Sequence, residues 1–139
     1  ILSAILNHAS STADDALFAK AAAMLQQYHA TDNKPETQQL RIFVALQQQD
    51  YTLAKQQLQQ ILQAYPELTS EWRNAGWLAL TTSDQSWLRQ LYPQLQRQAR
   101  SEANQLRLLA AMAERLGQFQ QLGALSLRRQ RLQHLHQWH

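Results

Sequence analysis

The residues best suited to chemistry in this chain are histidines close to its C-terminal end. His134, His136 and His139 lie within a six-residue stretch. His136 and His139 are one helical turn apart, a spacing that lets both side chains face one zinc or nickel ion. His134 points elsewhere on the same helix, and the nearest carboxylate in the sequence is Glu114. We therefore interpret the segment as a polar chain end and expect no metal site.

Other catalytic patterns are missing from the sequence. Asp14 and Asp15 form an adjacent carboxylate pair, but neighbours on a helix point in different directions, so we assign them to helix capping. The sequence has no glycine-rich phosphate loop, no Gly-x-Ser-x-Gly elbow and no cysteine. We therefore expect no enzyme activity, no catalytic residue and no cofactor.

Charge is distributed unevenly along the 139 residues, whose net charge is +3. Residues 1–85 carry five basic against eight acidic side chains, whereas residues 86–139 carry eight arginines against two acidic ones. A basic half suits nucleic acid, an anionic lipid surface or an acidic protein. Aromatic residues do not interleave with the arginines, which disfavours nucleic acid. No apolar run approaches the roughly 18 residues of a membrane span, so we expect none.

Helices are the elements that must position these side chains. Strand-like alternation is absent, proline occurs only at positions 35, 66 and 93, and glycine only at 76, 117 and 123. Capping residues and breakers predict about seven or eight helices. They cover residues 1–7, 12–29, 35–48, 51–65, 69–81, 84–99, 101–116 and, from near Gln118, the rest of the chain. Pro93 predicts a kink or break near Gln90–Tyr92.

Short stretches of the chain recur with a period of 34 residues. This spacing separates Trp72 from Leu106, and Gly76 from Ala110. The same step leads from Tyr51 through Gln85 to Phe119. A period of this size is typical of repeat arrays, which present a surface to a partner.

These residues resemble the tetratricopeptide repeat, whose unit is an antiparallel pair of helices, A and B. Gly76 and Ala110 match the small residue of helix A, and Trp72 and Leu106 its large residue. Helix B is matched by Tyr51, Phe119, Ala54 and Tyr92, and the terminal proline by Pro66. The departures from the pattern are Leu88 and Leu122 in place of alanine and Ser83 in place of glycine. The match is best over residues 50–122.

The resemblance implies an all-α, right-handed solenoid of antiparallel helix pairs that forms one domain, residues 1–139. Residues 1–34 would be a degenerate repeat, and residues 35–68, 69–102 and 103–122 would follow as repeats. Residues 118–139 would be a capping helix. A weaker resemblance links Gln39–Trp72 to the small tetratricopeptide-like chaperones that hold needle subunits in type III secretion. A plain helical bundle is the alternative.

In this family, helix A lines a concave groove, so the resemblance implies a partner-binding surface on two helices. Its residues would be Arg73, Trp77 and Leu80 in one repeat, and Asn104, Arg107, Ala111, Glu114 and Arg115 in the next. Trp77 is the strongest candidate, because tryptophan beside arginine is common in binding hot spots. Core packing is the alternative role for Trp77.

We therefore predict a protein-interaction scaffold or chaperone that binds a peptide or helix, in the cytoplasm or periplasm of a bacterium. The alternative is a regulatory or nucleic-acid-associated domain that uses the arginine-rich second half.

The last predicted helix carries Arg128, Arg129 and Arg131, and it either caps the last repeat or docks on a partner. The chain begins at Ile1 rather than methionine, which is typical of a fragment or a processed form.

Overall fold

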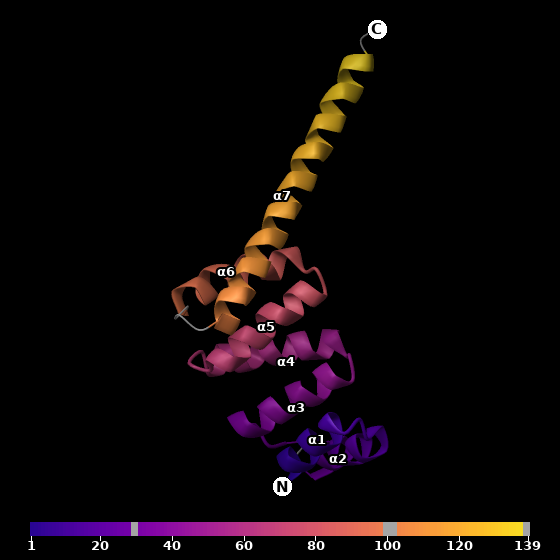
Figure 1. The fold of residues 1–139 in the computed structure, drawn as a ribbon, viewed down its shortest axis with the longest axis vertical. Helices are drawn as coiled ribbons and strands as arrows, with labels where there is room; N and C mark the ends of the chain where they lie inside the picture. Colours follow the sequence, from indigo (N-terminus) through magenta and orange to yellow (C-terminus); the bar gives the residue numbers. More distant parts are fainter. Residues whose placement is uncertain (29–30, 99–102, 138–139) are drawn as a thin grey trace. The chain divides into compact units, whose positions relative to one another are not determined.

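A computed structural model describes residues 1–28, 31–98 and 103–137, with side chains placed up to Leu122 in the last range. The described residues form seven helices and no strand, so the predicted all-α class is confirmed (Figure 1). The helices are α1 (Leu2–Ser11), α2 (Asp15–Tyr28), α3 (Pro35–Gln47), α4 (Tyr51–Ala64), α5 (Thr69–Thr81), α6 (Gln85–Gln98) and α7 (Ala103–Gln137). The chain divides into two compact units, residues 1–71 and 72–139.

The first unit contains two helix pairs, α1 with α2 and α3 with α4. Leu6, Ala9, Phe18 and Ala21 form the buried core of the first pair. Side chains of α3 pack against this core, among them Phe43, whose ring centroid lies 6.1 Å from that of Phe18 at a tilted angle of 58°. Tilted aromatic pairs at this separation are favourable beyond the area they bury, so α3 is held to the first pair.

The second unit contains most of α5 and all of α6 and α7. A Cβ atom on Gly76 would lie 2.9 Å from Cδ2 of Leu108 on α7 and 3.1 Å from Cδ1 of Leu95 on α6. The first distance is shorter than real Cβ contacts and the second is tighter than most, so the absence of a Cβ allows this close helix approach without a shift of the two leucines. The small residue that the sequence places at position 76 of the repeat pattern thus lies where α5 approaches both α6 and α7.

Three turns between paired helices share one geometry. The second residue after each preceding helix has a positive φ angle: 54° for Ala13, 58° for Gln49 and 52° for Ser83. In each turn the next residue, an aspartate, donates its backbone N–H to an alanine carbonyl 2.9 Å away; the acceptors are Ala9, Ala45 and Ala79. This is the hydrogen bond that closes a helix through a left-handed residue. The second and third turns are 34 residues apart, as the sequence period predicts, and the first two are 36 apart.

The same aspartates begin the next helix in each pair. Oδ1 of Asp14, Asp50 and Asp84 accepts the backbone N–H three residues later, at 3.1, 3.3 and 3.2 Å. A side-chain acceptor at this position satisfies a helix N–H that has no partner within the helix. The predicted capping role of Asp14 is confirmed, and Asp50 and Asp84 cap the following helices in the same way.

Two predicted helix breaks are not observed. The sequence predicts an eighth helix beginning near Gln118, but α7 continues through this region to Gln137. No glycine in the described residues has a positive φ, so Gly117 does not form a turn, and the glutamine and leucine residues around it favour helix.

The break predicted near Pro93 is not observed, because α6 runs from Gln85 to Gln98, and the alternative of a kink stays a prediction. The buried residues Leu91 and Leu95 lie on either side of the proline. Proline has no N–H, so the backbone carbonyl four residues before Pro93 has no helical donor. Pro93 is exposed, so water can donate to that carbonyl instead.

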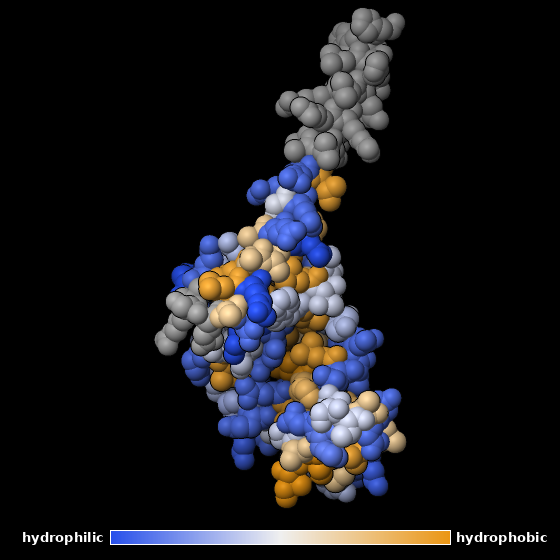
Figure 2. Space-filling model, in the orientation of Figure 1, coloured by the Kyte–Doolittle hydropathy of each residue, from blue (hydrophilic) through white to orange (hydrophobic). Residues whose placement is uncertain are grey.

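No helix in the part of the chain that the structure describes combines the length and the hydropathy needed to cross a bilayer. The visible face in Figure 2 alternates hydrophilic areas with smaller apolar ones. The single domain, the right-handed solenoid and the repeat family stay predictions.

Candidate partner-binding groove

The second unit places α5 and α7 side by side in the same direction. Each is antiparallel to α6, against which α7 packs and to which Gly76 of α5 comes close (Figure 1). The 34-residue period matches Arg73 on α5 with Arg107 on α7, Trp77 with Ala111, and Thr81 with Arg115.

A depression of about 350 Å³ lies between these helices, and we call it the α5–α7 groove. It is lined by Trp77, Leu80, Thr81, Ala111, Glu114, Arg115 and Gln118. Five of these residues are among those that the sequence predicts for the partner-binding surface. The period and the helical repeat therefore bring residues more than 30 positions apart to one surface.

The other predicted residues lie outside the depression, toward the N-terminal ends of the two helices. Arg73 is half-buried and one turn before Trp77, while Arg107 is exposed and one turn before Ala111. Asn104 is exposed in the first turn of α7. Sequence reasoning missed Thr81 and Gln118. A step of one helical turn from Trp77 and from Glu114 would have found them.

Trp77 is 46% exposed, so the interpretation of this residue as a core side chain is wrong. Its backbone carbonyl accepts a hydrogen bond of 2.8 Å from Oγ1 of Thr81, which holds that side chain close to the helix. Leu80, next to it in the groove, is half-buried. The groove thus has an apolar wall that includes an accessible indole, the kind of surface that gains most from contact with a partner.

Arg115 connects α7 to the turn between α5 and α6. Its Nη1 donates a hydrogen bond of 2.6 Å to Oγ of Ser83, the residue with the positive φ angle. A guanidinium has five N–H donors in a planar fork, and this hydrogen bond uses one of them. The contact orients the guanidinium at the C-terminal end of the groove, opposite the end marked by Arg73 and Arg107.

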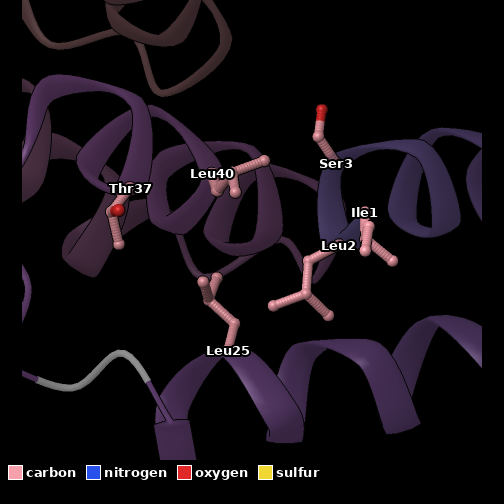
Figure 3. Close-up of a pocket in the computed structure, with 6 residues that line it drawn as sticks. All are labelled: Ile1, Leu2, Ser3, Leu25, Thr37 and Leu40. Carbon is pink, nitrogen blue, oxygen red and sulfur yellow. The ribbon is translucent and has the colours of Figure 1, made fainter.

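The first unit has hollows of a different character. One, of about 300 Å³, is lined by Ile1, Leu2, Ser3, Leu25, Thr37 and Leu40. Figure 3 shows Leu2 and Leu25 pointing toward each other across it. Its polar side chains are the hydroxyls of Ser3 and Thr37, and Oγ1 of Thr37 donates to Oδ2 of Asp32 at 2.9 Å. None of the lining side chains is titratable.

A second hollow of the first unit, of about 360 Å³, lies among α2, α3 and α4. Leu25, Val44 and Leu53 contribute apolar surface, and Arg41 and Gln57 contribute polar groups. Oε1 of Gln57 is buried without a hydrogen-bond partner. Within the described residues of both units, no three or more His, Asp or Glu side chains are grouped so that they could hold a metal ion.

Several predicted features lie outside the described side chains. These are the histidines at positions 134, 136 and 139 and the arginines at positions 128, 129 and 131. Comparisons with protein-family models, with curated proteins and with solved structures find no match to this chain.

Proposed function

We propose that this chain is a protein-interaction module that holds a peptide or helix of its partner in the α5–α7 groove. The observation that carries the proposal is the half-exposed Trp77, set beside Leu80 and facing Ala111 across the depression. Burial of a tryptophan and its aliphatic neighbours on binding contributes roughly 25 cal/mol per Å² of apolar surface. The groove thus supplies an anchor for an apolar side chain, with charged residues along its rim.

The proposed role is scaffold or chaperone rather than enzyme. The groove contains one carboxylate, Glu114, and one cation, Arg115, and no histidine or cysteine. Such a lining recognises shape and charge but has no nucleophile paired with a base. The tetratricopeptide-like family and a bacterial cytoplasm or periplasm belong to the same proposal, on the strength of the 34-residue period and the matching residues.

Selection of peptides from a random 12-residue library displayed on phage tests the proposal. The full chain should enrich peptides that share an apolar anchor, and Trp77→Ala should weaken their binding by roughly 2 kcal/mol, or about 30-fold. The urea unfolding midpoint should stay close to that of the wild type, because Trp77 is half-exposed.

Tyr28→Ala is the matched control for this experiment. Tyr28 is an exposed aromatic residue of α2 in the other unit, so its truncation should leave peptide binding unchanged. Peptides that bind Trp77→Ala as tightly as the wild type would contradict the proposed groove. A library without any enriched peptide would contradict peptide binding altogether.

The arginine-rich second half favours one alternative, a nucleic-acid-associated domain. Residues 86–139 carry eight arginines against two acidic side chains. Phosphate contacts release counterions, so the affinity for a DNA duplex would fall steeply with salt. Titration of a labelled 20-base-pair duplex at about 50 and 200 mM salt separates this alternative from an apolar groove, whose peptide affinity changes little.

A further inference from the structure

The α5–α7 groove combines an apolar centre with positive charge at both ends. We propose, on the basis of the peptide-binding function above, that its partner segment is acidic on both sides of an apolar anchor. The anchor contacts Trp77, one carboxylate faces Arg107 and the other faces Arg115. The class of partner is thus an acidic peptide segment whose charges bracket a single large apolar side chain.

The positions of the arginines along the helices determine this pattern. On α7, Arg107 and Arg115 lie one turn before and one turn after Ala111, which lines the groove together with Trp77. One turn of helix rises about 5.4 Å. The two carboxylates should therefore lie about 5–6 Å to either side of the anchor. Acidic side chains meet this distance two residues away in an extended peptide, or three to four residues away in a helical one.

The charge of the surface supports an acidic partner. The second unit, residues 72–139, contains nine arginines and three acidic residues. Around the groove itself, Arg73, Arg107 and Arg115 accompany one carboxylate, Glu114. Arginine forms two parallel hydrogen bonds with a carboxylate, and this geometry is more selective than the point charge of lysine. Complementary charge of this kind also speeds association and suppresses wrong partners.

Arg115 and Glu114 have opposite expected effects on the affinity for an acidic peptide. The hydrogen bond from Arg115 to Ser83 orients the guanidinium before a partner arrives, which lowers the entropy lost on binding. Glu114 lines the groove and is exposed, so it repels a carboxylate placed opposite it. Removal of this negative charge should therefore strengthen the binding of acidic peptides.

The same phage-displayed library tests the proposal when its enriched peptides are compared between variants. Peptides selected by the wild-type chain should contain aspartate or glutamate on both sides of the apolar anchor. Arg107→Gln and Arg115→Gln should each weaken the best such peptide about two- to fivefold, as removal of one exposed charge pair does. Glu114→Gln should tighten it by a similar factor.

The matched control removes two arginines from α6. Arg89 and Arg97 are exposed there and lie outside the groove lining, so the Arg89→Gln/Arg97→Gln variant changes the net charge as much as Arg107→Gln/Arg115→Gln does. It should leave the affinity for the selected peptide within twofold of the wild type. Arg107→Lys and Arg115→Lys keep the positive charge. Their effect on peptide affinity shows how much the planar guanidinium contributes beyond its charge.

The outcomes separate this proposal from the function on which it rests. Peptides that depend on Trp77 but show no excess of acidic residues would overturn the acidic class and leave the groove standing. Equal losses in the α6 control and the groove variant would also overturn it, because the effect would then be one of net charge. Binding that does not depend on Trp77 would overturn the proposed function itself.

Discussion

Helices α5 and α7 share one sequence pattern but differ in what covers it. Gly76 and Ala79 are buried on α5, whereas Ala110 and Ala113, one 34-residue period later, are exposed on α7. On α5, the small residue lets Leu95 of α6 and Leu108 of α7 come within contact distance. On α7, the chain continues as a helix past Gly117 instead of turning back. A small residue therefore marks where a helix can approach, and the fold decides whether one does.

The two helices differ at the point where α5 ends and α7 continues. The α5 helix is followed by Ser83 with a positive φ and by Asp84, whose carboxylate caps α6. The equivalent residues after the first half of α7 are Gly117 and Gln118. Glycine permits the turn, but glutamine lacks the short carboxylate that caps a helix and is itself a good helix former. The missing aspartate is consistent with the continuous α7.

The largest difference in stability should come from truncating two leucines that the 34-residue period matches, one on α6 and one on α7. Leu88 on α6 is fully buried, and Leu122 on α7 is 63% exposed. Leu88→Ala should lower the free energy of unfolding by roughly 2–5 kcal/mol, since it removes buried methyl groups and leaves a cavity. Leu122→Ala should change it by less than about 0.5 kcal/mol. Urea unfolding followed by circular dichroism measures both, and similar losses would mean that Leu122 is covered.

An intermediate difference in stability should come from enlarging the matching small residues of α5 and α7. Gly76→Leu should lower the free energy of unfolding by roughly 1–3 kcal/mol, because the new side chain collides with Leu108 and Leu95. Ala110→Leu is the matched control and should be nearly neutral, as Ala110 faces solvent. The same urea experiment applies, and wild-type stability in Gly76→Leu would contradict the close contact of α5 with α6 and α7.

The smallest effect should be an increase in stability. Gly117 lies in the interior of α7, and a Cβ added to it would meet nothing within 4 Å. Gly117→Ala should therefore raise the free energy of unfolding by up to about 1 kcal/mol through its higher helix propensity. If the chain turned at Gly117 with a positive φ, the same substitution would lower stability instead. The sign measured by thermal and urea unfolding thus tests the continuity of α7.

Local chemistry in the sequence was enough to determine where most helices begin. Helix starts are marked by aspartates at positions 14, 50 and 84. A carboxylate there accepts a free backbone N–H within the next turn, which is a short-range effect. Pro35 likewise begins α3 at its first residue, where a missing N–H costs nothing. The resemblance to the tetratricopeptide repeat also implied that Trp77, Leu80, Glu114 and Arg115 share a surface, and these four residues line one groove.

Only the tertiary structure decided which of these patterns became contacts. Pro93 breaks a helix by local rules, yet Leu91 and Leu95 are buried on both sides of it and α6 continues. The pattern allowed Trp77 either in the core or at the surface, and the helices around it leave it half-exposed. Gly117 and Ala110 satisfied the requirements of a fourth helix pair. Their burial, however, depends on a neighbouring helix that folds back, and the type of a residue does not specify that neighbour.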